Sequence, residues 1–78
     1  MTEKPKMQII YRLVAFRIEY NREKAGMTQE KLAKAIGLDR TTVVNIERGR
    51  QRILLHTIKD IAVALNIKPV ELLKGVWE

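Results

Sequence analysis

The hydrophobic and polar positions of this chain repeat with the period of α-helices along almost its whole length. Apolar residues recur three or four positions apart, and no segment alternates as cleanly as a half-buried β-strand does. The spacing predicts five helices, over about 6–24, 29–36, 40–48, from 55 to a cap at Asn66, and 69–74, with a connector over 50–54. We therefore expect an all-α protein, a compact five-helix bundle that forms a single domain over 1–78.

The predicted first helix carries two apolar stripes instead of one. The first stripe is Ile10, Val14, Ile18 and Ala25, and the second is Ile9, Leu13, Phe16 and Tyr20. A helix with two apolar faces is either deeply buried or contacts something besides its own core. Four more apolar residues lie near the C-terminus: Val70, Leu73, Val76 and Trp77. Together with the second stripe they form either a dimer surface or part of the closed core, and we favour a C-terminal dimer interface.

The other predicted helices each have one apolar face. The residues expected to be buried are Leu32, Ala33 and Ile36 in the second helix, Val43 and Ile46 in the third, and Leu55, Ile58, Ile61, Ala62 and Leu65 in the fourth. Leu38 is expected to fill the corner behind the turn between the second and third helices. Thr28 and Asp39 are good N-caps for these two helices, and Pro69 is suited to opening the fifth.

Residues 29–48, with the sequence QEKLAKAIGLDRTTVVNIER, join two short helices through a tight turn. Ala33 is small where the helices would cross, and Gly37 suits the left-handed backbone of the turn. Two helices joined in this way form a helix-turn-helix, whose second helix enters the major groove of DNA. An ordinary helical hairpin would satisfy the apolar spacing, but it would not require Ala33, Gly37 and the capping Asp39 together. We therefore expect a DNA-binding motif whose recognition helix covers about 39–48.

The net charge of the chain also indicates an anionic partner. Fifteen Lys and Arg stand against nine Asp and Glu, which gives a formal charge of +6. A basic domain of this size most often meets an anionic polymer or surface, and basicity for solubility alone is the alternative. Because the chain has no cysteine and a single histidine, His56, we expect no disulfide, no metal and no cofactor. Self-association is the stabiliser that remains open to so short a chain.

Two classes of protein receive no support from the sequence. No apolar run approaches the roughly 18 residues of a membrane span, and the start of the chain has no signal-peptide pattern. We expect a cytoplasmic protein with no membrane partner. The sequence also offers no nucleophile–His–acid set, Gly-rich phosphate loop or clustered carboxylates, so we do not expect an enzyme.

Four segments resemble the Cro and phage-repressor family of regulators, also called the xenobiotic-response-element type: MTQEKLA, DRTTVVNIERG, TIKDIAVALNI and KPVELL. They follow the order and spacing of the family over roughly 14–73. The resemblance implies a lambda-repressor-like bundle that binds operator DNA, usually as a two-fold dimer. Three departures concern helix boundaries and the core. Relatives often have Pro and a capping Ser at Ile53 and Leu54, a capping Ser or Thr at Lys68, and a core Leu at Asn21.

The resemblance also implies roles for individual residues. Gln29 matches a residue that bonds a DNA phosphate and braces the recognition helix. Arg22 and Glu47 match a pair that forms a buried or semi-buried salt bridge between the first helix and the recognition helix. The outward face of the third helix carries the residues that match base contacts: Arg40, Thr41, Val44 and Asn45.

The chemistry of this outward face suits base recognition. Arg can bind a guanine edge, Asn an adenine edge, and Thr or Val can pack on thymine methyl groups. The alternatives are a phosphate contact for Arg40 and simple surface filling for Thr41 and Val44. Three further arginines follow the recognition helix, namely Arg48, Arg50 and Arg52. They would place positive charge along one DNA strand and add affinity without reading sequence, the alternative being a solvated basic loop.

These observations predict a sequence-specific DNA-binding transcriptional regulator, a repressor or autoregulator, that binds a palindromic operator in double-stranded DNA as a homodimer. The alternative is a protein-interaction module, such as an antitoxin or a co-regulator, that bridges a partner protein and binds DNA weakly. The arginines around the recognition helix favour DNA. Phage repressors, restriction–modification controllers and antitoxins all include chains of this size, although RTTVVNIERG followed by RQRI resembles the controllers.

Overall fold

The computed structural model describes the backbone of residues 3–76 and the side chains of residues 9–76. Its helices follow one another as α1 (Glu3–Lys24), α2 (Gln29–Ala35), α3 (Arg40–Glu47), α4 (Leu55–Ala64) and α5 (Pro69–Leu73). No strand occurs in this part of the chain, and the predicted all-α five-helix bundle is confirmed. The first helix begins three residues earlier than expected, and α2, α3 and α5 each end one residue earlier.

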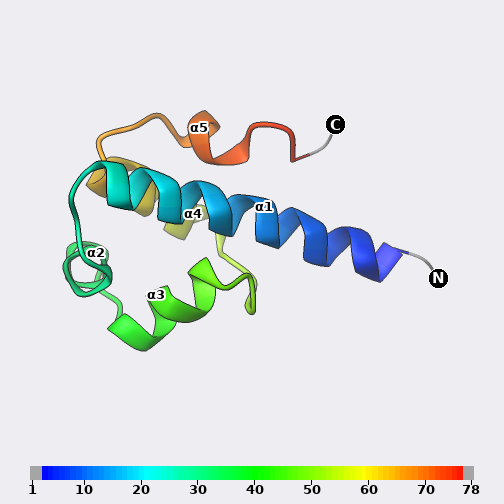
Figure 1. Ribbon diagram of the computed structural model, residues 1–78, viewed down its shortest axis with the longest axis horizontal. Helices are drawn as coiled ribbons and strands as arrows, with labels where there is room; N and C mark the ends of the chain where they lie inside the picture. The colour runs from blue at the N-terminus through cyan, green and yellow to red at the C-terminus, as the bar shows by residue number, and fades with distance from the viewer. Residues whose placement is uncertain (1–2, 77–78) are drawn as a thin grey trace.

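The other helices are assembled around α1 (Figure 1). In this view α5 lies above α1 and α3 lies below it, while the N-terminal part of α1 extends past the rest of the molecule. Contacts join α1 to both α3 and α5, α2 to α3 and α4, and α4 to α5. Within the described residues, none of the helices combines the length and the apolar character that crossing a membrane requires.

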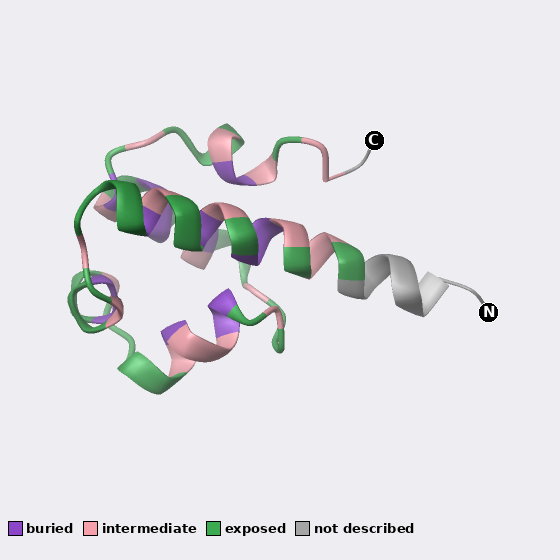
Figure 2. Ribbon diagram, in the orientation of Figure 1, coloured by how far each residue is buried: buried purple, intermediate pink, exposed green. Residues whose placement is uncertain are grey.

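The core lies where the inward faces of the five helices meet, and the buried segments in Figure 2 turn towards this interior. Its buried apolar residues are Val14, Ala15, Ile18, Leu32, Ala33, Val43, Ile46, Ile58, Ile61, Ala62, Leu65 and Leu72. The buried faces predicted for α3 and for most of α2 and α4 are confirmed. Ala15 and Leu72 join the core without having been predicted.

Side-chain caps open α2 and α3 as the sequence predicts. Thr28 Oγ1 accepts a hydrogen bond from the backbone N–H of Lys31 at 3.0 Å, and Asp39 Oδ1 accepts one from that of Thr42 at 2.8 Å. The hydroxyl of Thr42, and then its backbone N–H, lower the pKa of the Asp39 carboxyl. The first turn of α3 is therefore held by a charged cap.

The turn between α2 and α3 is made by Gly37, which has a φ of +74°. The backbone N–H of Leu38 reaches back to the carbonyl of Ala33 at 2.9 Å, the bond that ends a helix at a left-handed residue. The prediction that the Leu38 side chain fills the corner behind the turn was wrong. It is exposed, because Leu38 follows the left-handed Gly37 in the turn and belongs to neither helix.

Two further burial predictions were wrong, and both concern residues at the end of a helix. Leu55 is 77% exposed, because it is the first residue of α4 and lies at the rim of a groove instead of in the core. Ala25 is exposed because α1 ends at Lys24, so the helical spacing that placed it on the buried stripe no longer applies.

The second apolar stripe of α1 does not close the core. Ile9, Phe16 and Tyr20 are exposed, and Leu13 is half-buried. The rings of Phe16 and Tyr20 stack with their centroids 6.4 Å apart. This stripe is therefore an apolar surface of α1 on the outside of the bundle.

The departures from the family pattern have local consequences. Leu54 and Lys68 precede α4 and α5, and neither forms a side-chain cap. The C-cap of α4 is Leu65, and the predicted cap Asn66 follows it with a φ of +59°. Asn21, where relatives have a core Leu, is half-buried and donates from Nδ2 to the carbonyl of Arg17 at 2.8 Å. Helix α4 nevertheless begins at the expected residue.

Candidate nucleic-acid interface

A buried ion pair joins α1 to α3. Arg22 donates from Nε to Glu47 Oε2 at 2.6 Å and from Nη2 to Glu47 Oε1 at 3.1 Å, a bidentate arrangement. The two residues are only 8% and 9% exposed. The pKa of Arg22 is raised, mainly by its hydrogen bond to Glu47, which outweighs the opposite effect of burial. This is the pair that the resemblance implied.

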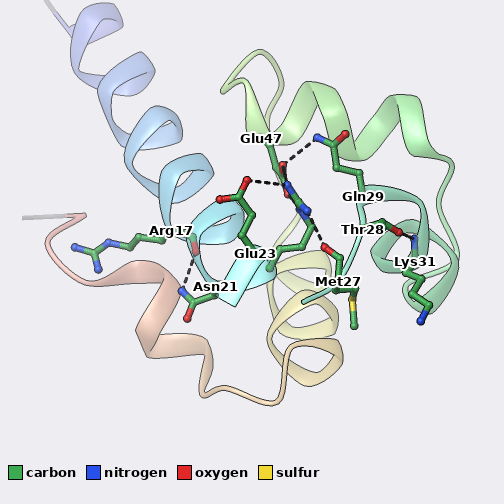
Figure 3. Close-up of polar contacts among 9 residues, drawn as sticks. Arg17, Asn21, Glu23, Met27, Thr28, Gln29, Lys31 and Glu47 are labelled. Carbon is green, nitrogen blue, oxygen red and sulfur yellow. Dashed lines mark hydrogen bonds and ion pairs between the residues drawn. The ribbon is translucent and has the colours of Figure 1, made fainter. Parts of the chain in front are cut away.

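Two more hydrogen bonds connect this pair to the start of α2 (Figure 3). Gln29, the first residue of α2, donates from Nε2 to Glu47 Oε1 at 3.0 Å. Arg22 Nη1 donates to the carbonyl of Met27 at 2.7 Å. Removing one partner of such a pair leaves the other charge buried and unpaired, which typically costs about 3–5 kcal/mol. The network therefore holds α1, α2 and α3 in one relative arrangement.

Helix α3 has one face in the core and one face outside. Val43 and Ile46 are buried, and residues spaced three or four apart share a face of a helix. The opposite face consists of Arg40, Thr41, Val44, Asn45 and Arg48; Arg40, Thr41 and Arg48 are exposed, and Val44 and Asn45 are half-buried. The structure thus brings the four residues expected to contact bases onto one side of α3, away from the core.

Helix α3 ends at Glu47, and the chain turns away from it at Gly49, which has a φ of +67°. The N–H of Arg50 donates to the carbonyl of Asn45 at 3.0 Å, and that of Gly49 to the carbonyl of Ile46 at 3.0 Å, the paired bonds of a Schellman ending. The chain then runs on through the connector. The arginines expected to contact phosphates are all exposed: Arg48, Arg50 and Arg52. Among residues 9–76, no carboxylate forms an ion pair with any of them.

Three of the four residues expected at a dimer interface are described by the structure, and they lie on α5 or in the segment after it, apart from α3. Leu73 and Val76 line an apolar groove of about 250 Å³, whereas Val70 is exposed on α5. Trp77 lies outside the described residues. The rest of the groove is formed by α1, the connector and the start of α4, through Ile10, Tyr11, Val14, Ile53, Leu55 and Ile58.

Sequence reasoning missed two parts of this region. The carbonyl of Met27, which accepts a hydrogen bond from Arg22, is a backbone group, so the pattern of side chains in the sequence cannot predict its role. Tyr11 and Ile53 line the groove although they belong to no predicted apolar stripe. The apolar run Ile53–Leu55, which directly follows the arginines of the connector, is the one local signal that could have indicated the groove.

Comparison with protein families matches residues 18–72 to the helix-turn-helix family. A Neisseria hypothetical transcription factor, from Neisseria meningitidis serogroup B, is 38% identical over 71 residues, which cover 91% of this chain and 67% of that protein. Control protein C.BamHI of Bacillus amyloliquefaciens is 44% identical over 50 residues. This match covers 64% of the chain and 62% of the control protein, just under two thirds of its length.

Solved structures agree with these matches. The restriction-modification controller protein C.AhdI from Aeromonas hydrophila superposes with a TM-score of 0.80 at 37% identity. The superposition covers 83% of this chain and 94% of that one. The fold, the motif and the relatives lead to the same family of helix-turn-helix DNA-binding regulators. This chain belongs to the helix-turn-helix family of the Cro and phage-repressor type, and it is a DNA-binding transcriptional regulator.

Proposed function

We propose that the protein is a sequence-specific repressor or autoregulator that binds a palindromic operator as a homodimer, through one domain spanning 1–78. The observation that carries this proposal is the outward face of α3. A recognition helix needs exposed groups on a face whose direction is fixed. Core packing of Val43 and Ile46 fixes the opposite face, and the Arg22–Glu47 pair ties the helix to α1.

Base reading falls to the four residues of that face. Arg40 has a fork of donors that matches a guanine edge, and Asn45 has the donor and acceptor that match an adenine edge. Thr41 and Val44 present methyl groups that can pack on thymine. Arg40 and Thr41 are exposed at the first turn of α3, which is the end that approaches base edges in helix-turn-helix proteins.

Affinity for the DNA backbone falls to residues on either side of the recognition helix. Gln29 uses one N–H of its amide on Glu47, and the second can meet a phosphate. Arg48, Arg50 and Arg52 are exposed, form no ion pair with a carboxylate among residues 9–76, and supply positive charge after α3. Such contacts set the register on the duplex and carry no sequence information.

A second copy of the chain is the partner that we assign to the apolar groove. Leu55 is strongly exposed and lines the groove with Leu73 and Val76, the preceding Leu54 is also exposed, and apolar surface of this kind marks protein–protein contacts. A chain of this length buries only about 60% of its unfolded surface and gains stability from a partner. Trp77, which follows Val76 in the sequence, is part of the proposed contact.

Control of restriction–modification genes is the setting that the relatives favour. C.BamHI and C.AhdI are control proteins by name, and both match this chain well. We therefore propose the controller role ahead of a phage repressor or an antitoxin. A regulator of this kind works in the cytoplasm, which is the location we propose.

Selection of bound duplexes from a random pool tests the proposal. We expect enrichment of a palindrome whose half-sites lie one helical turn apart, about 10–10.5 base pairs, or a multiple of this. Affinity is then compared between the enriched duplex and a scrambled duplex of the same composition and length. Equal affinity for the two would refute sequence-specific binding, and an enriched site without two-fold symmetry would refute the dimer.

A further inference from the structure

Arg12 of α1 lies against the turn that ends the recognition helix. A side-chain carbon added to Gly49 would lie 3.0 Å from Arg12 Cγ and 3.3 Å from Arg12 Cα. Both distances are shorter than ordinary van der Waals contact, so the missing side chain at Gly49 is what allows the α1 backbone to come this close. The first part of the Arg12 side chain therefore packs next to Gly49, which lies between Arg48 and Arg50 in the sequence.

This contact adds a cation to the basic segment that follows α3. Consecutive Cα atoms are about 3.8 Å apart, so the Cα atoms of Arg48 and Arg50 lie within roughly 9 Å of that of Arg12. The three side chains therefore leave the backbone within one small patch of the surface. The three guanidinium groups can meet neighbouring phosphates of the same backbone.

Arg12 is also available for an anion. Its side chain is exposed, and within residues 9–76 no carboxylate lies at ion-pair distance from it. Arg22, two to three turns further along α1, differs in both respects, because it is buried and paired with Glu47. Arg22 therefore positions α3, and Arg12 is left with an uncompensated charge beside the end of α3.

We propose that Arg12 contacts a DNA phosphate next to those met by Arg48 and Arg50, so that the DNA-binding surface extends from the helix-turn-helix onto α1. The proposal rests on the chain binding DNA, and it adds a contact from outside residues 29–48. The contact raises affinity for every sequence alike, because the phosphates are the same beside every base.

The salt dependence of binding tests this contact on a random-sequence duplex of about 30 base pairs between about 50 and 200 mM KCl. Each phosphate contact contributes about 0.9 to the slope of log K against log salt concentration. Arg12→Gln, which keeps the aliphatic stem on Gly49, should therefore lower the slope by about 0.9 for each bound protomer. Over a fourfold rise in KCl, the variant should lose about 3.5-fold less affinity per bound protomer than the wild type does.

Two matched variants complete the experiment. Arg12→Lys keeps the charge and should keep the wild-type slope. Lys68→Gln removes an exposed cation next to α5, on the opposite side of α1 from α3 (Figure 1), and should also keep it. All variants are checked for unchanged helical circular dichroism, and Arg12→Ala is measured in parallel so that the result does not depend on one replacement.

Each outcome decides something. A wild-type slope in Arg12→Gln overturns the proposal, and so does an equal fall in Lys68→Gln, because net charge alone would then explain the effect. Wild-type protein that binds the duplex with no salt dependence would instead refute phosphate binding around α3 as a whole. The failure of the Arg12 contact and the failure of the proposed function are thus distinguishable.

Discussion

Replacing Gly49 with alanine tests the close approach of α1 to the recognition helix. The backbone φ of +67° at Gly49 is left-handed, which costs a residue with a Cβ about 1–2 kcal/mol. The new Cβ would also overlap Arg12, at 3.0 Å from Cγ and 3.3 Å from Cα. Inserting a methyl group into a site already packed typically costs about 1–3 kcal/mol. Gly49→Ala should therefore lower the free energy of unfolding by about 2–5 kcal/mol.

Gly37→Ala is the matched control, because Gly37 has a similar φ of +74° and no heavy atom lies within 4 Å of the added Cβ. It should lose only the backbone part, about 1–2 kcal/mol. The difference between the two variants, about 1–3 kcal/mol, isolates the contact with Arg12. For a domain of this size each 1 kcal/mol moves the melting temperature by about 4–8 °C, so Gly49→Ala should melt at least about 4 °C below Gly37→Ala.

Thermal unfolding followed by circular dichroism measures this difference. The two variants are compared at equal protein concentration, because association makes the melting temperature concentration-dependent. Adding Arg12→Ala to Gly49→Ala removes the overlap at Cγ and leaves the overlap at Cα, so only part of the lost stability should return. Coincident melting curves for Gly49→Ala and Gly37→Ala would refute the close approach, and with it the geometric basis of the Arg12 contact.

The remaining predictions concern the ion pair, the recognition face, the helix cap and the groove. Glu47→Ala should lower the free energy of unfolding in urea by about 3–5 kcal/mol; a loss as small as that of the exposed Glu30→Ala would contradict a buried pair. Asn45→Ala should weaken binding to the selected duplex by about 1–3 kcal/mol and relax preference at one base position; uniform weakening on all duplexes would make it a backbone contact. Because the pKa of Asp39 is lowered, its charge stabilises the fold fully at pH values above the usual aspartate pKa, about 3.9. This stabilisation is lost as the pH falls through the lowered pKa of Asp39. The stability difference between wild type and Asp39→Asn should thus be constant near neutral pH and shrink in acid, and an ordinary Asp39 titration midpoint by NMR would be inconsistent with the cap. Leu73→Asp should shift sedimentation towards the monomer, and an unchanged profile would exclude the groove as the dimer contact.

Local features of the fold could be predicted because they depend on residues one or two helical turns apart. The caps Thr28 and Asp39 and the buried pair Val43 and Ile46 are of this kind. Apolar periodicity failed at helix ends. Leu55 has the spacing of a buried residue, but it is the first residue of α4 and its side chain is exposed.

Contacts between distant segments could not be predicted from periodicity, since spacing does not say which helices touch. Arg22 and Glu47 are 25 residues apart, and only the resemblance to a family implied that they pair. The approach of Arg12 to Gly49 depends on the angle at which α1 crosses the end of α3, and no local pattern in either segment encodes that angle. The residues proposed for the recognition face could be listed from the sequence. The neighbouring surface around Arg12 could be identified only from the way α1 packs against the end of α3.

Helix α1 connects the two halves of the proposed function. On the side facing α3 it holds the recognition helix through Arg22 and closes on Gly49 through Arg12. On another side, Ile10 and Tyr11 line the groove that we assign to a second copy. One continuous helix of 22 residues therefore packs against the recognition helix and also lines the groove. In the proposed dimer the groove contact therefore sets the separation of the two recognition helices, and with it the half-site spacing, while the outward face of α3 sets base preference. These two properties of the operator are consequently encoded by separate residues and can change independently.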